Sequence, residues 1–357
     1  MKIRLFSSLT LLAFLLVLTN CQKDEIQTTE QAKNISLEYF DYFSRDVPDH
    51  LYDRGGMWIG NDSIANRQAA LGRLLFYDPI LSKNNLISCA SCHQQSKAFS
   101  DNLEFSTGLF GEQTTRNSMA LVNAGFQRRF FWDFSGDGLE KEVMKPIQNH
   151  IEMGIENIEQ LTQKLQQSTH YPVLFEEVFR QSVITEGNLS LAIATFVKSI
   201  YCYDSKYDQG MTTEFANFTR SEEAGMSLFF GKAGCGGCHN APHFTSNWTA
   251  NIGLDMTYED KGAGNGSFKI PSLRNIELTA PYMHDARFTT LAEVVDHYDH
   301  GVKNHKSLNW YLQDRSVHPR QPKRLNLSDH EKQDLIAFLK TLTDESMLKA
   351  ERFSDPF

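Results

Sequence analysis

The chain has 357 residues, enough for two domains of ordinary size, and its 41% hydrophobic and 22% charged residues are typical of a soluble globular protein. A formal net charge of −9 disfavours a nucleic-acid partner, because binding to phosphates requires a basic face. An acidic protein suits a basic electron-transfer partner, but net charge alone does not identify one.

The N-terminus has the features of an export signal. A basic start precedes an apolar run over residues 5–18, which is too short to be a good membrane span. The run ends in Leu-Thr-Asn before Cys21, which resembles a bacterial lipobox, whose cysteine is lipidated. We therefore predict a lipoprotein signal peptide over residues 1–21, with a conventional signal peptide cut nearby as the alternative, and a polar tether over residues 22–40. The expected location is the periplasm, with the membrane contacted only through a lipid on Cys21.

The pentad Cys-x-x-Cys-His occurs twice, at residues 89–93 and 235–239. Two cysteines at this spacing can form thioethers to the two vinyl groups of a haem, and the histidine that follows can turn under the iron as its ligand. A zinc site or a redox dithiol needs only Cys-x-x-Cys, so the histidine in both copies, together with the export signal, disfavours these alternatives. The sequence therefore predicts two haem c groups, held by Cys89, Cys92, His93, Cys235, Cys238 and His239.

Cys202 is the one cysteine outside the export signal and the two pentads. It lies in an apolar stretch over residues 191–203 that has helical spacing. This position predicts a buried and unreactive thiol rather than a disulfide partner.

The two halves of the chain resemble each other weakly. The sequence Gly-x-x-Leu-Phe precedes both pentads, at residues 72–76 and 225–229, and each copy is expected to end an amphipathic helix. Several matches at one offset indicate a duplication. These matched pairs stand 152 residues apart: Asp133 with Asp285, Leu139 with Leu291, and Val143 with Val295.

Most of the remaining sequence has helical apolar spacing, and strand signals are few. We expect helices within residues 158–164, 171–180 and 191–200, with breaks near Pro172 and Gly187. A capped helix start is expected at Ser328 and a glycine-rich loop over residues 258–267. The predicted fold is mainly α, with two cytochrome c-like helical domains that each enclose one covalently bound haem. These domains are expected over residues 41–200 and 201–345, followed by a tail over residues 346–357.

Taken together, these motifs resemble those of the bacterial di-haem cytochrome c peroxidases, a family that includes the MauG proteins. The resemblance runs from about Ala69 to Thr343. It rests on residues 71–79, 87–89, 116–117, 131–133, 146–148, 152–153, 271–275 and 281–284. The resemblance implies that the N-terminal haem reduces hydrogen peroxide and that the C-terminal haem takes electrons from a small donor protein, a cytochrome c or a cupredoxin. It also allows a homodimer.

The resemblance assigns roles to two further side chains. Glu152 matches the catalytic glutamate, and a carboxylate in an apolar pocket has a raised pKa and can both accept and return a proton. By position alone, a solvated glutamate at a helix end would be the simpler interpretation of Glu152. Trp132 matches the tryptophan between the two haems and is expected to relay electrons, although tryptophan is also a common core residue. The resemblance further implies a calcium ion held by the Asn117 side chain and the carbonyls of Thr279 and Pro281.

The first haem is expected to have an open coordination site. Many family members carry a histidine, in the loop after the first pentad, that ligates the peroxidatic iron until the second haem is reduced. No histidine lies between His93 and His150 in this sequence. We therefore expect a five-coordinate or water-ligated iron, with His150 as the one nearby residue that offers an alternative ligand.

The second haem departs from the same pattern. Reductively activated peroxidases complete this site with a methionine, which Tyr298 replaces here, as a tyrosine does in MauG. On a helix, Tyr298 shares one face with Leu291 and Val295 while His297 points away. A tyrosinate ligand favours ferric iron and lowers the potential compared with methionine. The alternatives are that Tyr298 is only a core residue and that the ligand is His297, His300 or Met283.

Three functions follow from these observations. The first is a peroxidase that reduces hydrogen peroxide to water with electrons from a small redox protein. The second is a MauG-like enzyme that oxidises a protein through Trp132, which Tyr298 and the missing histidine favour. The third is a di-haem electron carrier without catalysis, and Glu152 argues against it because a carrier needs no acid beside its iron.

Overall fold

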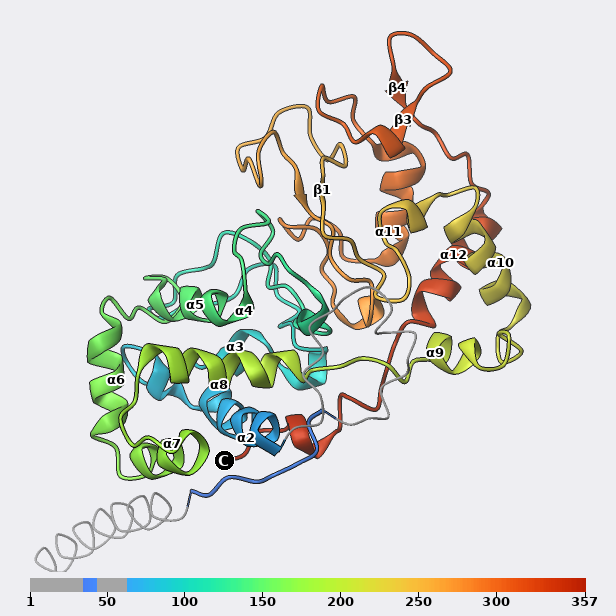
Figure 1. Ribbon diagram of the computed structural model, residues 1–357. Coiled ribbons are helices and arrows are strands. Elements are labelled where there is room, and N and C mark those ends of the chain that lie inside the picture. Colours follow the sequence, from blue (N-terminus) through green and yellow to red (C-terminus); the bar gives the residue numbers. More distant parts are fainter. Residues whose placement is uncertain (1–34, 44–62) are drawn as a thin grey trace, which may run out of the picture.

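The computed structural model describes residues 35–43 and 63–357, so the predicted signal peptide, Cys21 and most of the predicted tether lie outside the described residues. Within those two ranges, no helix combines the length and the apolar character needed to cross a membrane. Two helical lobes follow each other along the chain, and the last segment runs back from the second lobe to the first (Figure 1).

The described residues form helices and a few very short strands, as predicted. The first lobe contains α2 (Ser63–Tyr77), η2 (Pro79–Leu81), α3 (Cys89–Cys92), η3 (Gln95–Lys97), η4 (Ala124–Phe126), α4 (Leu139–Glu142), α5 (Met144–Gln148), α6 (Ile158–Gln166), α7 (Tyr171–Phe179) and α8 (Glu186–Lys198). The helices of the second lobe are α9 (Lys206–Met211), α10 (Arg220–Phe230), η5 (Cys235–Gly237), η6 (Ile276–Leu278), α11 (Leu291–Asp296), the π-helical η7 (His297–Gly301), η8 (Trp310–Leu312) and α12 (Asp329–Lys340). Antiparallel pairs join β1 (Thr249–Ala250) to β2 (Phe268–Lys269) and β3 (Gln313–Asp314) to β4 (Gln321–Pro322), and η9 (Glu351–Phe353) lies near the end of the chain.

The predicted helices are present, with small differences at their starts. Pro172 and Gly187 do not break helices but lie in the first turns of α7 and α8. Proline is tolerated there because the first helical N–H groups have no partner within the helix. Ser328 caps α12 as predicted: its hydroxyl accepts from the Glu331 backbone N–H, and the Glu331 side chain accepts from the Ser328 N–H.

The same helix crossing occurs in both lobes. Helix α2 packs against α8 at Gly72, where an added Cβ would lie 2.0 Å from the carbonyl oxygen of Ala192. Helix α10 packs against α12 at Gly225, where an added Cβ would lie 1.9 Å from the carbonyl oxygen of Asp334. Both glycines begin the repeated Gly-x-x-Leu-Phe sequence, so the sequence repeat corresponds to a repeated close approach of two helices.

Each crossing is completed by a pair of buried phenylalanines. Phe76 and Phe196 meet edge to face with ring centroids 5.2 Å apart in the first lobe. Phe229 and Phe338 lie 5.1 Å apart in the second lobe. These pairs belong to two separate hydrophobic clusters, so each lobe has its own core.

The C-terminal segment packs against the first lobe, although it follows the second lobe in sequence. Met347 and Phe353 are buried in the core of the first lobe. Arg73 donates to the carbonyl oxygen of Ser354 at 2.6 Å, and the Tyr77 hydroxyl donates to the carbonyl of Phe353 at 2.6 Å. The residues predicted only as a tail therefore include part of a core.

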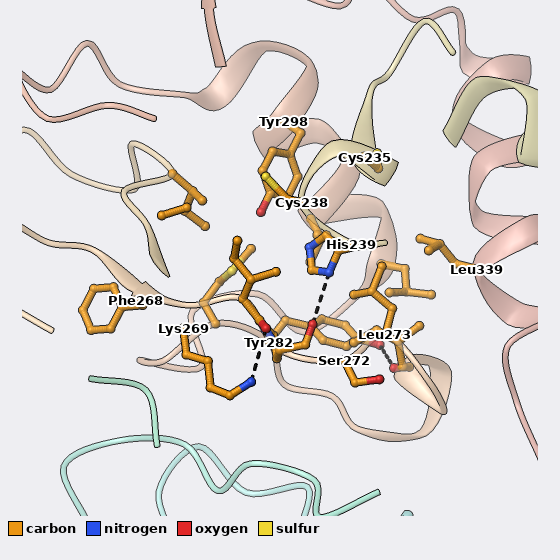
Figure 2. A pocket seen from close by; sticks show the side chains of 18 of the residues that line it. Cys235, Cys238, His239, Phe268, Lys269, Ser272, Leu273, Tyr282, Tyr298 and Leu339 are labelled. Carbon is orange, nitrogen blue, oxygen red and sulfur yellow. Dashed lines mark hydrogen bonds between the residues drawn. The ribbon is translucent and has the colours of Figure 1, made fainter. Parts of the chain in front are cut away.

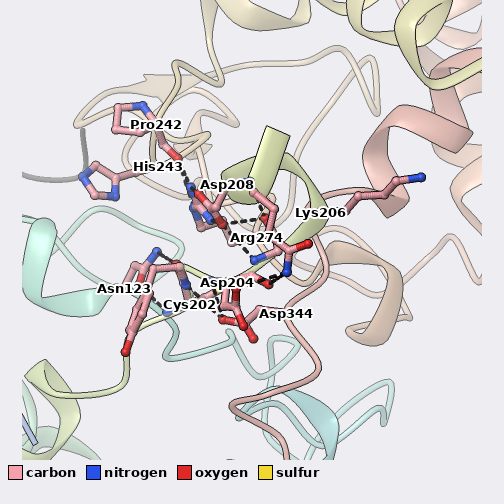
Figure 3. Close-up of polar contacts among 12 residues, drawn as sticks. Asn123, Cys202, Asp204, Lys206, Asp208, Pro242, His243, Arg274 and Asp344 are labelled. Atoms are coloured by element: carbon pink, nitrogen blue, oxygen red, sulfur yellow. Dashed lines mark hydrogen bonds and ion pairs between the residues drawn. The ribbon is translucent and has the colours of Figure 1, made fainter. Parts of the chain in front are cut away.

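A buried polar network joins the linker between the lobes to both of them (Figure 3). Asn123 of the first lobe accepts from the Cys202 N–H and donates to the Cys202 carbonyl. The Asp344 carboxylate accepts from the backbone N–H groups of Tyr203 and Asp204 at 2.9 and 3.0 Å. Cys202 itself is fully buried, which raises the pKa of its thiol, as expected for an unreactive cysteine.

The centre of this network is a buried ion pair. The Arg274 guanidinium donates two parallel hydrogen bonds to the Asp208 carboxylate, at 2.7 and 2.8 Å, and both side chains are at most 2% exposed. Arg274 also donates to the carbonyl of Pro242, in the loop that follows the second pentad. The pair thus ties α9 to the segment that carries His239.

Candidate functional site

The first pentad forms the short helix α3, which follows α2, η2 and a connecting loop. The backbone N–H of His93 donates to the carbonyl of Cys89, which places the histidine at the end of this helical turn. Its Nδ1 lies 3.0 Å from the carbonyl oxygen of Phe99, so Nδ1 carries the proton and Nε2 presents its lone pair. Burial lowers the pKa of His93, so the imidazole is neutral, as an iron ligand must be.

The second pentad repeats this arrangement in η5. The N–H of His239 donates to the carbonyl of Cys235, and its Nδ1 lies 3.1 Å from the carbonyls of both Phe244 and Pro271. Burial lowers the pKa of His239 to about 4, so this imidazole is also neutral, with Nε2 available. Both histidines therefore have the orientation and charge state that a haem ligand requires.

An apolar cavity surrounds the second pentad (Figure 2). Cys235, Cys238 and His239 line one part of it, and Tyr298 projects into it from η7. Aliphatic side chains from α11 and α12 complete the walls, among them Val295 and Leu339. Two thiols and a neutral imidazole at the edge of an apolar cavity fit a covalently bound haem c.

Tyr298 is the side chain predicted to ligate the second iron. It lines the cavity together with Leu291 and Val295, and burial raises the pKa of its hydroxyl above the usual value. Among the three competing ligands, His297 bonds through Nε2 to the carbonyl of Ile252, and the side chain of His300 is 64% exposed. Only Met283 among them also lines this cavity.

Trp132 lies between the two lobes. Its indole N–H donates to the carbonyl of Asn117 at 2.9 Å, and its own carbonyl accepts from the N–H of Lys269 at 2.8 Å. The ring lies 6.4 Å from that of His284 and borders the same cavity as the second pentad. These bonds hold Trp132 against segments of both halves of the chain, and its role as an electron relay stays a prediction.

Glu152 is partly buried and acts electrostatically on the first pentad. Its carboxylate accepts a hydrogen bond from the Asn149 side chain at 2.8 Å, and burial raises its pKa. Burial raises the pKa of the Cys89 thiol to about 12 and that of Cys92 to about 11, and the charge of Glu152 contributes to both. The charge of Glu152 thus reaches both cysteines of the first pentad, whereas His150, the alternative ligand, is exposed.

The three predicted calcium ligands come from both lobes, Asn117 from the first and Thr279 and Pro281 from the second. Asn117, Thr279 and Pro281 border the same cavity, and the N–H of Asn117 donates to the carbonyl of His284 at 2.8 Å. Among the residues that the structure describes, no group of three or more His, Cys, Asp and Glu side chains could hold a metal ion. Calcium binding by one amide and two backbone carbonyls stays a prediction.

Comparisons with known proteins agree with this geometry. Residues 66–215 match a family described as di-haem cytochrome c peroxidase. The methylamine utilization protein MauG of Methylorubrum extorquens is 31% identical over 289 residues, which cover 78% of each chain. The chain belongs to the di-haem cytochrome c peroxidase and MauG family.

Other members of the family are similarly close. The cytochrome c551 peroxidase of Nitrosomonas europaea is 33% identical over 241 residues, 64% of this chain and 71% of the relative. The crystal structure of a MauG-like protein associated with microbial copper homeostasis superimposes with a TM-score of 0.72 at 34% identity, covering 81% of this chain and 93% of that one. The chain is therefore an oxidoreductase of the di-haem peroxidase type, with haem as its cofactor.

Several residues of these sites were not predicted from the sequence. The carbonyls of Phe99, Phe244 and Pro271 orient the two histidines, but a backbone acceptor leaves no signal in the residue type. Lys269 is buried beside Trp132 and lines the cavity, and burial lowers its pKa to about 7. Its signal was a lysine between two apolar residues, which is also typical of an exposed position on a strand.

Proposed function

We propose that this protein reduces hydrogen peroxide to water at the first haem, with electrons that a small redox protein supplies through the second haem. The observation that carries the proposal is the place of Glu152, a partly buried carboxylate whose charge acts on both Cys89 and Cys92. A plain electron carrier has no use for such a group. The peroxidases among the relatives also support the proposal.

The chain itself contributes the proton chemistry. Haem, when bound through Cys89, Cys92 and His93, supplies an iron that accepts peroxide and exchanges electrons. Glu152 takes the proton from one peroxide oxygen and returns it to the other, so that the second oxygen leaves as water. Asn149 donates to Glu152 and fixes its orientation for both transfers. The complete reaction consumes one peroxide, two electrons and two protons, and releases two water molecules.

The electron route passes between the lobes. Trp132 is fixed by hydrogen bonds to Asn117 and Lys269, so its ring keeps one position between the two halves. We assign Trp132 to the relay and Tyr298 to the second iron. Calcium at Asn117, Thr279 and Pro281 would strengthen the same contact between the lobes.

The proposal extends to the location of the protein. Export with a lipid on Cys21 would place the enzyme in the periplasm, where c-type haem is attached and small cytochromes and cupredoxins carry electrons. Replacing Cys21 by serine is expected to release the protein from the membrane fraction. Retention of the variant in that fraction would contradict the lipid anchor.

A steady-state assay with peroxide and reduced cytochrome c tests the proposed reaction. Glu152→Gln keeps the shape and the hydrogen bond to Asn149 but cannot take up a proton, so kcat should fall by about 10²- to 10⁴-fold. Glu156→Gln is the matched control, because its side chain is 80% exposed and pairs with Lys83 at the surface. Equal activity of the two variants would remove the role of Glu152.

A second candidate is a MauG-like enzyme that draws electrons from a protein substrate. Tyr298 in the cavity and the absence of histidine between His93 and His150 favour it, as do the relatives named MauG. Under this alternative the wild-type protein oxidises a partner protein with peroxide and without an added donor, and Trp132→Phe loses that reaction. Turnover of peroxide only with reduced cytochrome c supports the first function. If neither assay shows turnover, the third function, a di-haem electron carrier without catalysis, is supported instead.

A further inference from the structure

The segment from Lys303 to Arg324 is strongly basic, although the whole chain carries a net charge of −9. It contains six cationic side chains and one acidic one, Asp314. The six are Lys303, Lys306, Arg315, Arg320, Lys323 and Arg324. Within the described part of the chain, none of them forms a salt bridge, so their charge is not neutralised locally.

This segment projects from the second lobe. It contains η8 and the β3–β4 hairpin, which lies at the far end of the lobe in Figure 1. The side chains of Lys306, Arg315 and Arg320 are exposed. The hairpin is anchored to the lobe at its base, where the N–H of Lys323 donates to the carbonyl of Leu312 at 2.7 Å.

Exposed aromatic side chains connect this basic segment to the second pentad. Tyr311 packs on Gly237, where an added Cβ would lie 2.8 Å from the ring, and Phe230 packs in the same way on Gly236 at 2.6 Å. Trp310 stacks on Tyr311 with ring centroids 3.6 Å apart and is 48% exposed. Phe230 and Tyr311 are themselves 48% and 42% exposed. The two glycines of the pentad are thus covered by aromatic rings that solvent reaches directly.

Aromatic and arginine side chains together are typical of the energetic centre of a protein interface. A basic surface also orients an acidic partner before contact and speeds its association. We propose that Phe230, Trp310 and Tyr311, with the exposed cations of residues 303–324, form a basic-aromatic patch that docks an acidic redox protein, which delivers its electrons to the second haem. The inference rests on the proposed function, because it names the class of donor that this function needs.

The local charge reverses what the net charge suggests. The overall acidity of the chain favours a basic donor, but a donor that docks on this patch meets five exposed cations and one carboxylate, because Lys323 lines the cavity instead. An anionic lipid surface is also attracted to basic and aromatic side chains. A lipid has no electrons to deliver, however, and the aromatic rings lie on the haem-attachment pentad itself.

One pair of probes isolates the charge of the partner. Native cytochrome c is basic. Succinylation replaces the positive charges of its lysines by carboxylates, so the two forms are the same redox protein with opposite charge. The mature holoprotein should bind the succinylated form more tightly at low ionic strength. Lys306→Glu/Arg315→Glu should weaken that binding and lower kcat/KM for the reduced succinylated form by about tenfold or more, because the attraction becomes repulsion.

Lys141→Glu/Lys349→Glu is the matched control. Both lysines are exposed, both lie outside the patch, and the double change alters the net charge by the same amount. This variant should retain binding and kcat/KM within about twofold, since screened charges far from the contact have little effect. Trp310→Ala removes an exposed ring without touching a core and should also weaken binding of the succinylated form.

Tighter binding of native cytochrome c by the wild type, or unchanged binding of the succinylated form by the patch variant, would overturn the inference. A vesicle assay tests the membrane alternative. The inference would also be overturned if the protein sedimented more with vesicles of phosphatidylcholine plus phosphatidylglycerol than with phosphatidylcholine alone, and if the patch variant lost this sedimentation but still bound the succinylated protein. Hydroquinone, a neutral donor that needs no docking, tests the peroxidase reaction separately. Failure with hydroquinone counts against the proposed function, whereas the binding measurement decides the patch.

Discussion

Replacing Gly72 by alanine is expected to destabilise the first lobe. The added methyl group would lie 2.0 Å from the carbonyl oxygen of Ala192 and 2.8 Å from the Cβ of Phe196. The first of these atoms belongs to the backbone of α8, which cannot rotate away as a flexible side chain can. Helices α2 and α8 must therefore separate by about 1 Å, since an ordinary contact requires more than 3 Å.

The net effect follows from two opposed contributions. Overpacking of a well-packed core costs about 1–3 kcal/mol, and a clash with backbone should lie at the upper end of that range. Alanine gains about 1 kcal/mol over glycine in a helix interior. The expected loss is therefore about 2 kcal/mol in the free energy of unfolding.

Urea denaturation followed by circular dichroism measures this loss. Gly187→Ala is the matched control: Gly187 also lies in a helix, but the nearest atom to an added Cβ is the Thr185 hydroxyl at 3.9 Å. That variant should be as stable as the wild type or slightly more stable. If Gly72→Ala were no less stable than Gly187→Ala, the crossing at Gly72 would not be the close contact described above.

Three further predictions concern pH, the second iron and the buried ion pair. Glu152 must be ionised to accept a proton, and burial raises its pKa, so peroxidase activity should fall as the pH decreases, with a midpoint above the usual 4.5 of glutamate. A profile of activity against pH measures this midpoint, and a midpoint at or below 4.5 would contradict the prediction. Tyr298→Phe should change the low-spin absorption of the oxidised protein, and an unchanged spectrum would end the assignment of Tyr298 as an iron ligand. Arg274→Met should cost about 3–5 kcal/mol in urea denaturation, because it removes the guanidinium that balances the charge of the buried Asp208 carboxylate and leaves the hydrogen bonds from Ser205 to hold it; a loss below about 1 kcal/mol would refute that reasoning.

Local patterns predicted the helices and the two pentads well. Leu291, Val295 and Tyr298 share one face as their helical spacing predicted, and all three line the cavity, although Tyr298 lies in the π-helical turn η7 that follows α11. The Gly-x-x-Leu-Phe repeat indicated duplication, and the structure adds its physical reason in the two helix crossings.

Contacts distant in sequence were not predicted. The ion pair of Arg274 and Asp208 joins residues 66 positions apart, and the sequence around either residue does not identify the other as its partner. The role of Phe244 depends on its carbonyl, which every residue has. The sequence did not indicate why the second pentad contains two glycines. In the structure, the rings of Phe230 and Tyr311 pack so closely on them that a side chain at either position would clash.

The return of the C-terminal segment to the first lobe determines when that lobe can be completed. A ribosome makes the N-terminal half first, and domains commonly fold in that order. Here the core of the first lobe is complete only after Met347 and Phe353 have been made. The ring of Phe353 lies against the rings of Phe99 and Phe196. Trimming of the last residues by a carboxypeptidase would therefore damage the first lobe, although that lobe is made earliest.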